Sequence, residues 1–324
     1  MAAPLLCVMG PTASGKTNLA IGLANALGGE LISVDSALVY RGLDIGSAKP
    51  TYPHHLIDIC DAAEVYSAAR FAGDARDAIA AVESRGRRPI LVGGSMLYYR
   101  ALLDGLAPMP AADAALRAQL EARAAEEGWP ALHRELSLID PRAAERIHPN
   151  HSQRILRALE VCLLSDRSLT EMHAEAATPL QRSSVCIALA PTDRAILHRR
   201  IEQRLHTMLD AGFLDEVRGL YARGDLDSTL PAIRSVGYRQ LWEHLEGRHD
   251  FDTAVRKALA ATRQLAKRQF TWLRKWPGLQ WLLTKEDGTV VRTAGDWGAF
   301  GGDPTSLTGD PVDVLTRYVR VAAL

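Results

Sequence analysis

Eight residues near the start of the chain match the pattern of a phosphate-binding loop. The stretch Gly10-Pro11-Thr12-Ala13-Ser14-Gly15-Lys16-Thr17 fits the motif G-x-x-x-x-G-K-[ST] at every defined position. In this motif the glycines let backbone N–H groups turn toward phosphate oxygens, and the N-terminus of the following helix adds partial positive charge. Lys16 can reach a terminal phosphate, and Thr17 can bind Mg²⁺. The loop predicts a di- or triphosphate ligand without deciding which one.

A second candidate is the carboxylate of Asp35, in the stretch Ser33-Val34-Asp35-Ser36. An apolar segment precedes it, so Asp35 is expected at the carboxyl end of a strand beside the phosphate loop, where ligands bind in open α/β sheets. A carboxylate there can accept a proton from an attacking nucleophile or hold Mg²⁺ through water. The structural alternative is a helix or turn cap, because Asp and Ser favour such positions.

A typical NTPase also has an apolar strand that ends in Asp and organises Mg²⁺ and the attacking water. In this chain the strand Ile90-Leu91-Val92 ends in Gly93-Gly94-Ser95 instead. This pattern argues against a motor or a GTPase. It favours a group-transfer enzyme of the kinase-like type.

The elements that must position these residues alternate between strands and helices. The expected strands are Leu5–Met9, Glu30–Asp35, His55–Ile59 and Arg88–Gly94, and the expected helices are Lys16–Leu27 and Ser67–Ser84. Strands that alternate with helices predict an α/β fold, with a P-loop NTPase-like parallel sheet flanked by helices.

The pattern changes near residue 112, where helices follow one another with no strand between them. The expected helices are Asp113–Glu127, Pro130–Ile139, Pro141–Ile147 and Ser152–Ser165, followed by a strand at Val185–Leu189 and helices at Asp193–Asp210 and within Phe251–Trp276. We therefore predict a first part of the P-loop core at 1–111, an inserted all-helical domain at 112–183 and a core continuation with basic helices at 184–285. The tail at 286–324 is expected to be loosely ordered, with one short helix after Pro311.

The composition is that of a globular protein without net charge. The 324 residues include 38 Lys and Arg and 38 Asp and Glu, with 47% apolar and 23% charged side chains, which excludes a mainly disordered chain or a coiled coil. The charge is nevertheless segregated, because residues 253–285 contain eight Lys or Arg and no Asp or Glu. Together with Trp272 and Trp276, this segment is typical of an RNA-facing helix.

Membrane and secretion signals are absent from the sequence pattern. No apolar run approaches the roughly 18 residues that a membrane span needs, and the apolar start lacks a basic region before it. The four cysteines form neither a C-x-x-C pair nor a zinc pattern. We expect a cytoplasmic protein with reduced, buried thiols.

Eight stretches spread in order over residues 10–276 form a specific combination. They are Gly10–Thr17, Ile32–Tyr40, Asp44–Pro50, His54–Asp58, Gly93–Tyr98, Gln153–Glu160, Ser235–Arg239 and Thr262–Gln269. Together they resemble the tRNA dimethylallyltransferase family, also called tRNA isopentenyltransferases. No zinc-finger extension of the kind some eukaryotic members carry is found, which favours a bacterial-type enzyme.

The resemblance implies a reaction and roles for the candidate residues. A dimethylallyl group would pass from dimethylallyl diphosphate to N6 of the adenosine just 3′ of the anticodon in tRNA. Asp35 would be the general base at N6, and Thr12, Lys16, Thr17 and Arg204 would surround the leaving diphosphate with Mg²⁺. Ser95 stands where the family usually has Thr, and its hydroxyl is expected to keep the contact with the reacting centre. The stretch between Pro50 and His54 is shorter than the family's usual run.

The resemblance also implies that the partner is a tRNA anticodon stem-loop, with no protein partner and a monomeric enzyme. The implied tRNA contacts are Asp35, Ser36, Ala37, Leu38, Ser95, Arg117, Gln153, Arg154, Ile155, Leu156, Arg157, Arg234, Ser235, Val236, Gly237, Tyr238, Arg239, Lys267, Arg268, Gln269 and Arg274. From the residues alone, Arg154 and Arg157 could equally form the solvated face of an amphipathic helix. Because the target base must leave its stack, we expect a channel that takes the adenine from one side and the diphosphate from the other. The helical insert would close on the stem-loop.

Three alternatives remain open at this point. A small-molecule P-loop kinase would share the loop and the acid, and an adenylate isopentenyltransferase would run the same chemistry on a free nucleotide. The long basic helical segment argues against the kinase, and the insert and the tRNA-matching segments argue against the adenylate enzyme. A phosphate-binding RNA chaperone would bind RNA without catalysis, and loss of RNA modification in Asp35→Ala with retained RNA binding would exclude it.

Overall fold

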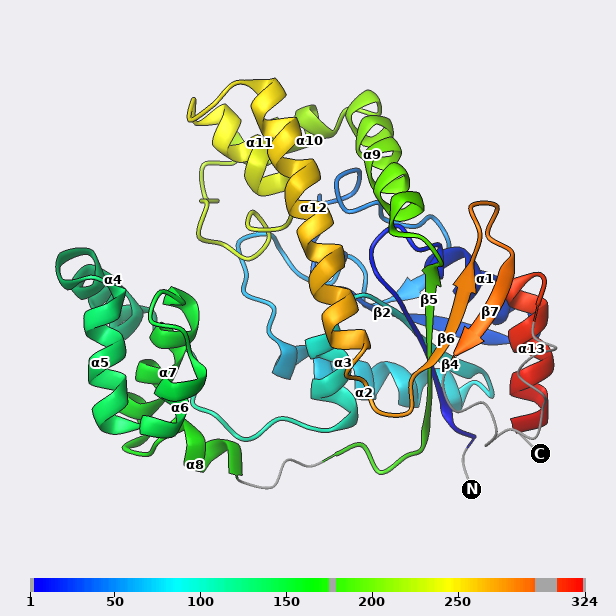
Figure 1. The fold of residues 1–324 in the computed structure, drawn as a ribbon, viewed down its shortest axis with the longest axis horizontal. Coiled ribbons are helices and arrows are strands. Elements are labelled where there is room, and N and C mark those ends of the chain that lie inside the picture. Colours follow the sequence, from blue (N-terminus) through cyan, green and yellow to red (C-terminus); the bar gives the residue numbers. More distant parts are fainter. Residues whose placement is uncertain (1–2, 175–178, 295–307, 323–324) are drawn as a thin grey trace. The chain divides into compact units, whose positions relative to one another are not determined.

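The computed structural model describes residues 3–174, 179–294 and 308–322, and the chain divides into two compact units (Figure 1). The first unit comprises Met1–Leu102 and Gln181–Leu324, and the second comprises Leu103–Leu180. The backbone N–H of Leu180 donates to the carbonyl oxygen of Leu103 at 3.1 Å, which joins the two ends of the insert. The helical unit therefore has different bounds from the predicted 112–183.

A seven-stranded sheet forms the centre of the first unit, in the order β3-β2-β4-β1-β5-β6-β7. Its strands are β1 (Leu5–Met9), β2 (Gly29–Val34), β3 (His54–His55), β4 (Arg88–Gly93), β5 (Ser184–Pro191), β6 (Gln280–Thr284) and β7 (Val290–Ala294). Neighbouring strands are parallel except for the antiparallel pair β6 and β7. Every residue of β1 is buried, as expected for a parallel strand covered on both faces. The predicted α/β fold is confirmed.

The strand β3 is shorter than the predicted His55–Ile59. Leu56 and Asp58 adopt left-handed backbone angles, with φ of 64° and 57°. Such angles turn the chain away from an extended path. The apolar pattern predicts a strand over His55–Ile59. In the structure only His54 and His55 pair with β2.

Helices of the first unit pack against this sheet and against one another. They are α1 (Lys16–Leu27), α2 (Ala68–Ser84), α3 (Met96–Leu103), α9 (Arg194–Asp210), α10 (Phe213–Tyr221), α11 (Tyr238–Leu245), α12 (Phe251–Leu273) and α13 (Pro311–Ala322). Leu197 and Ile201 of α9 pack with Ala266 of α12, so these two helices form a layer beside the end of the sheet. None of the described helices is long and apolar enough to cross a membrane.

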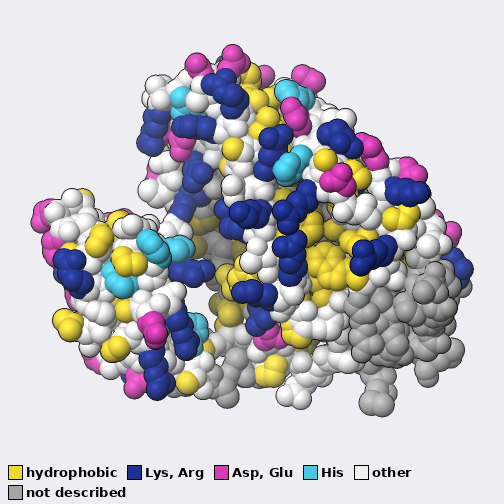
Figure 2. All heavy atoms as spheres, viewed as in Figure 1, with side chains coloured by type: hydrophobic (Ala, Val, Ile, Leu, Met, Phe, Trp, Pro, Cys, Tyr) yellow, Lys and Arg dark blue, Asp and Glu magenta, His cyan; other side chains and the backbone are white. Residues whose placement is uncertain are grey.

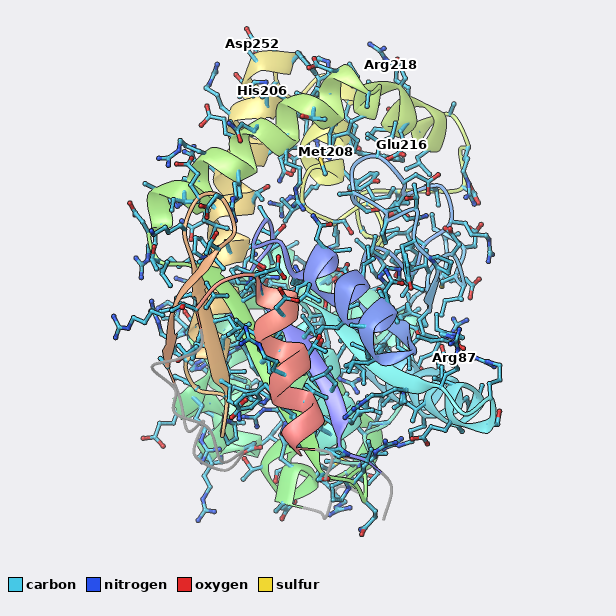
Figure 3. All side chains as sticks on the ribbon, turned by 90° about the vertical axis from the view of Figure 1, so that its right-hand side faces the viewer. Arg87, His206, Met208, Glu216, Arg218 and Asp252 are labelled. Atoms are coloured by element: carbon cyan, nitrogen blue, oxygen red, sulfur yellow. The ribbon has the colours of Figure 1, made fainter. Side chains whose placement is uncertain are left out.

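The tail differs from the loosely ordered segment predicted for 286–324. Its first part forms β7, and α13 packs beside α1 over the sheet, as Figure 3 shows. A Cβ atom on Gly22 of α1 would lie 2.4 Å from Val312, so the two helices approach closely. The apolar residues of α13 follow helical spacing, and Val314, Leu315 and Tyr318 are buried in the main core. The predicted short helix after Pro311 is therefore present, whereas 295–307 lie outside the described residues.

The second unit is a small helical bundle with a core of its own. It contains α4 (Ala114–Glu127), α5 (Trp129–Ile139), α6 (Pro141–Arg146), α7 (Ser152–Ser165) and α8 (Leu169–Ala174). Leu120, Leu132, Leu136, Ile155 and Leu159 are buried in its core. The four predicted helices are found within one or two residues of their expected bounds, and α8 was not predicted.

Candidate active site

Three loops meet at the carboxyl edge of the sheet because their strands end in register. Met9 of β1 and Val34 of β2 both pair with Gly93 of β4. The Gly10–Thr17 loop, the turn at Asp35 and the Gly93-Gly94-Ser95 turn therefore leave the sheet side by side. They border a cavity of about 110 Å³, whose wall includes Thr12, Lys16 and Thr17 together with Asp35, Arg204 and Gln269. The structure thus brings the predicted base and the predicted diphosphate residues to one cavity.

The glycines at this edge are required by close packing. A Cβ on Gly10 would lie 2.6 Å from the carbonyl oxygen of Leu189, and one on Gly93 would lie 2.0 Å from that of Val34. The end of β4 therefore has no room for the Asp that a typical NTPase places there. The glycine at the end of β4, where a typical NTPase has Asp, is therefore explained by the lack of space for a side chain.

Two cations from different helices line the cavity. Lys16 starts α1, and its Nζ donates to the carbonyl oxygen of Pro11 at 3.3 Å. Arg204 projects from α9 and donates through Nη2 to the hydroxyl of Thr12. Burial lowers the pKa of Lys16 to about 8, with the Asp35 charge opposing the shift and the Arg204 charge adding to it. Burial likewise lowers the pKa of Arg204. Two partly desolvated cations are unfavourable alone, so the site is suited to an anion.

Asp35 combines a turn with a free carboxylate oxygen. Its Oδ1 accepts hydrogen bonds from the backbone N–H of Ala37 at 2.9 Å and of Leu38 at 3.5 Å. Within the described ranges no residue bonds Oδ2. The turn and the functional interpretation are therefore compatible, since one oxygen orients the side chain and the other can meet a ligand.

Ser95 lies beside this turn. Its Oγ accepts from the backbone N–H of Ser36 at 3.1 Å and lies 3.4 Å from the Ser36 hydroxyl. The backbone N–H of Ser95 donates to the carbonyl oxygen of Val34 at 3.2 Å. In the structure Ser95 therefore supports the segment that carries Asp35, and its expected contact with the reacting centre stays a prediction.

A metal ion would find few protein ligands in this cavity. Thr17 and Asp35 line it, and the buried hydroxyl of Ser33, also in its wall, has no hydrogen-bond partner. Hydroxyl and carboxylate oxygens suit Mg²⁺, which usually keeps several waters and binds phosphate oxygens as well. Among the described residues, no cluster of three or more His, Cys, Asp or Glu side chains could hold a metal ion. The residues present fit a Mg²⁺ ion that enters together with a diphosphate.

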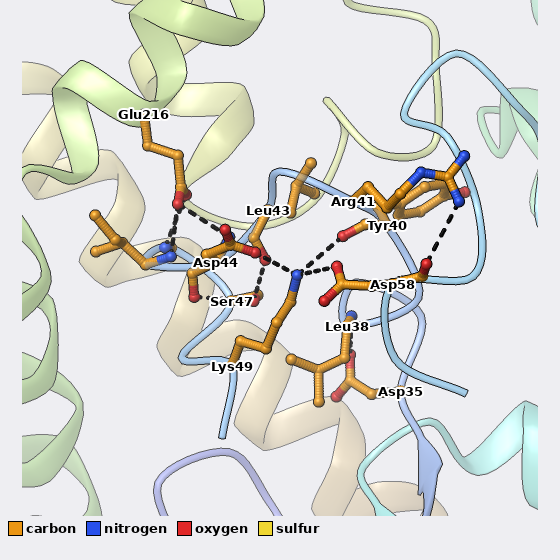
Figure 4. A network of polar contacts seen from close by, with 12 residues as sticks. Asp35, Leu38, Tyr40, Arg41, Leu43, Asp44, Ser47, Lys49, Asp58 and Glu216 are labelled. Atoms are coloured by element: carbon orange, nitrogen blue, oxygen red, sulfur yellow. Dashed lines mark hydrogen bonds and ion pairs between the residues drawn. The ribbon is translucent and has the colours of Figure 1, made fainter. Parts of the chain in front are cut away.

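Glu216 of α10 binds the loop that begins at Asp44 (Figure 4). Its carboxylate accepts three backbone N–H groups, from Asp44 at 2.9 Å, Ile45 at 2.6 Å and Gly46 at 3.1 Å. The next residues of this loop, Ser47 and Ala48, line the cavity. Sequence reasoning missed Glu216, because an acidic residue in the first turn of a helix is ordinarily explained by the helix dipole.

The same loop is fixed at its other end by Lys49. Its Nζ donates to the carbonyl oxygen of Tyr40 at 3.2 Å and forms ion pairs with Asp44 and Asp58 (Figure 4). Gly46 packs under the ring of Phe213, where a Cβ would lie 1.9 Å from a ring carbon. The wall of the cavity is therefore rigidly held despite its irregular backbone.

Comparison with known proteins identifies the family of this chain. Residues 38–276 match the family model described as IPP transferase. The chain belongs to the IPP transferase family. It is 55% identical over 298 residues to a tRNA dimethylallyltransferase of Methylococcus capsulatus, covering 90% of this chain and 96% of the relative. It is 59% identical over 281 residues to one of Halorhodospira halophila, covering 85% and 91%.

Solved structures agree with this assignment. The full-length tRNA isopentenylpyrophosphate transferase of Bacillus halodurans is 38% identical, with a TM-score of 0.64, and the match covers 87% of this chain and 90% of that one. A eukaryotic dimethylallyltransferase described as acting on tRNA is 25% identical, with a TM-score of 0.73, covering 88% and 74%. The chain is therefore a transferase.

The tRNA contacts that the family resemblance implied differ in exposure within the first unit. Arg234 and Arg239 flank the start of α11, and Lys267, Arg268 and Arg274 lie on or just after α12; all five are exposed. Figure 2 shows Lys and Arg side chains gathered over the face where Figure 1 places α12. The exposed members are available to a polyanion.

Other members of that set are buried. Tyr238 is 1% exposed, and its hydroxyl donates to Glu216 at 2.6 Å. Burial is the main cause that raises the pKa of Tyr238, and this hydrogen bond is the second. Gly237 is buried, and Gln269 is 8% exposed. Trp276 packs edge-on against Tyr99 with ring centres 6.2 Å apart, so its predicted RNA-facing position is wrong. These buried residues do not offer a side-chain surface to RNA, and among them Gln269 lines the cavity.

In the helical unit, the implied tRNA residues also divide into two groups. Gln153 and Arg154 are exposed, and Leu156 is half-buried. Ile155 is fully buried in the core of that unit, which rules out a surface contact by its side chain. Consecutive residues of an amphipathic helix lie on both its buried and its exposed face. The segment Gln153–Arg157 therefore includes residues of both faces.

Arg117 and Arg157 are tied to the buried carboxylate of Glu160. Arg117 donates through Nε at 2.8 Å and Nη2 at 2.9 Å, and Arg157 donates through Nη1 at 2.6 Å. The backbone N–H of Asp113 adds a fourth bond at 2.9 Å. Burial alone would raise the pKa of Glu160, but the bonds from Arg117 and Arg157 outweigh it and the net shift is downward.

Replacing Glu160 with alanine is expected to destabilise the helical unit. Two arginines would lose their partner, although both are about one-third exposed and can reach water, so we expect a loss of about 2–3 kcal/mol in the free energy of unfolding. Urea unfolding followed by circular dichroism measures it. The exposed Glu121 of α4 offers the matched control, because Glu121→Ala should leave stability unchanged. Equal stability of the two variants would contradict a structural role for the Glu160 network.

Proposed function

We propose that the protein transfers a dimethylallyl group from dimethylallyl diphosphate to N6 of the adenosine 3′ of the anticodon in tRNA, releasing diphosphate. The observation that carries this proposal is the single cavity bordered by Lys16, Arg204 and Asp35. The two cations suit a leaving diphosphate, and the carboxylate suits an incoming amine. The names of the relatives support tRNA as the acceptor and dimethylallyl as the transferred group.

The remaining wall of the cavity suits the transferred group. Leu38, Pro50, Val92 and Leu265 also line the cavity and contribute apolar surface. A branched five-carbon chain is apolar, so burying it there is favourable. An anionic substrate without an apolar chain would not cover this apolar surface.

The proposed step breaks the bond between C1 of the dimethylallyl group and the diphosphate oxygen and forms a bond between C1 and N6. Lys16 and Arg204 neutralise the charge that develops on the departing diphosphate. Oδ2 of Asp35 accepts one N6 proton, while Oδ1 stays bonded to the Ala37 N–H and keeps the carboxylate in place. A Mg²⁺ ion held by Thr17 would supply further charge neutralisation.

Binding of dimethylallyl diphosphate is expected to weaken as pH rises above about 8. The folded pKa of Lys16 is lowered from 10.5 to about 8, so the free enzyme loses this cation in that range. KM for the diphosphate, measured from pH 6.5 upward, should therefore increase on the alkaline side; a constant KM through pH 9.5 would contradict it. The effect on folding has the opposite sign, because the unfolded chain binds more protons between about 8 and 10.5, and the free energy of unfolding should rise there.

An acceptor comparison tests the proposed function against its alternatives. The protein is incubated with Mg²⁺ and dimethylallyl diphosphate, and with either unmodified tRNA or AMP as the acceptor. We expect modified adenosine in the digest of the tRNA reaction and no modification of AMP. Modification of AMP would favour an adenylate isopentenyltransferase, and phosphoryl transfer from ATP to a small molecule would favour a kinase.

A further inference from the structure

The side chain of Gln269 connects α12 to the loop that lines the diphosphate side of the cavity. Its Oε1 accepts a hydrogen bond from the backbone N–H of Thr12 at 2.8 Å, and its Nε2 donates to the carbonyl oxygen of Gly94 at 3.0 Å. Both bonds are buried. Gln269 follows directly on the exposed cations Lys267 and Arg268, so one turn of α12 faces solvent and the cavity at once.

The two bonds require this amide in this orientation. One partner is a donor and the other is an acceptor, and an amide side chain offers both functions at one position. The space is also closed on the far side, because a Cβ on Gly94 would lie 2.3 Å from Nε2 of Gln269. The glycine turn after β4 therefore makes room for the side chain that holds it.

The bond to Thr12 has a consequence for phosphate binding. In a loop of this motif, backbone N–H groups ordinarily face phosphate oxygens. The Thr12 N–H instead points at Gln269, and the Thr12 hydroxyl accepts from Arg204 of α9. The position of Thr12 is thus set by α9 and α12. A displacement of α12 would leave a buried N–H unpaired, which is unfavourable enough that the loop is expected to follow the helix.

We propose that Gln269 is a positioning residue that couples RNA binding on α12 to diphosphate binding in the Gly10–Thr17 loop. The inference rests on the proposed function, because it requires that α12 bind tRNA and the loop bind the diphosphate. Coupling of this kind is reciprocal, so each ligand increases the affinity for the other by the same factor. Gln269 lines the cavity, and we assign it a positioning role because both of its amide atoms bond protein backbone groups.

The coupling factor is measurable as a ratio of two dissociation constants. Binding of an unmodified tRNA anticodon stem-loop is measured with Mg²⁺, in the absence and the presence of a saturating, non-transferable thio-analogue of dimethylallyl diphosphate. For the natural chain we expect the analogue to tighten RNA binding by about fivefold or more. In Gln269→Leu the factor should fall to about one.

A matched control and a second variant separate coupling from general damage. Gln264 lies on the same helix but is exposed, so Gln264→Leu should keep the natural coupling factor. Gln269→Glu keeps an acceptor for Thr12 but sets an oxygen against the Gly94 carbonyl, and it should lower the factor without abolishing it. This variant also decides the matter if Gln269→Leu does not fold.

Two results would overturn the inference while leaving the proposed function intact. One is a natural enzyme that modifies tRNA but shows a coupling factor of one. The other is a Gln269 variant that folds and retains the full natural factor. If the natural chain modifies no tRNA, the proposed function itself fails, and the acceptor comparison reveals that separately.

Discussion

Replacing Asp35 with asparagine should lower the rate of dimethylallyl transfer to tRNA by about 10³-fold, within the range that a general base contributes. Asparagine keeps the oxygen that accepts from the Ala37 N–H, so the turn after β2 should remain. It offers an amide in place of the second carboxylate oxygen, and this amide cannot take the N6 proton. Single-turnover measurements at saturating tRNA and diphosphate report the effect on chemistry alone.

Binding measurements serve as the control for Asp35→Asn. The dissociation constants of tRNA and of dimethylallyl diphosphate, and the thermal midpoint, should stay near those of the natural chain. A transfer rate within tenfold of the natural one would contradict the role of Asp35 as the base. Loss of RNA binding would instead indicate that Asp35 acts mainly as a tRNA contact.

Replacing Lys16 with methionine is expected to lower kcat/KM for dimethylallyl diphosphate by about 10²–10³-fold, which is typical for the loss of one group that stabilises developing negative charge. Methionine has a similar length but no charge, so Arg204 would be left as the principal cation in the wall of the cavity. Loss of a cation also removes an unfavourable buried charge, so Lys16→Met should be as stable as the natural chain or more so. Steady-state kinetics at fixed tRNA and a thermal melt together check both statements.

The matched control for this variant is Lys285→Met. Lys285 is exposed in the hairpin between β6 and β7 and belongs to the same unit. Its replacement should change neither kcat nor KM for dimethylallyl diphosphate. An equal loss in both variants, or a Lys16→Met enzyme with natural kcat/KM, would show that the Gly10–Thr17 loop does not hold the diphosphate.

The parts of the site that the sequence predicts are those encoded by neighbouring residues. The phosphate loop is one continuous motif, and its strand and helix are signalled by the apolar runs on either side of it. Asp35 follows a buried strand, so its place at the sheet edge follows from the strand order of an α/β fold. The helices of the second unit carry complete amphipathic patterns, and they appear almost at their expected bounds.

The parts that the sequence does not predict depend on residues far apart in the chain. Glu216 binds a loop about 170 positions earlier, and nothing in its own helix indicates that its carboxylate meets three N–H groups. The family pattern included Gln269 among RNA contacts, but only its place on the inner side of α12 shows that it bonds to Thr12. The helix α13 lies after a glycine-rich stretch in the sequence. The partners of its four buried apolar residues, which include residues of α1, are known only from the structure.

One measurement tests the central claim most directly. The protein is incubated with Mg²⁺, dimethylallyl diphosphate and unmodified tRNA, and both the released diphosphate and the modified nucleosides are quantified by mass. We predict one diphosphate released for each dimethylallyl group found on N6 of the adenosine 3′ of the anticodon. Diphosphate release without modified adenosine, or a group attached elsewhere in the tRNA, would contradict the account.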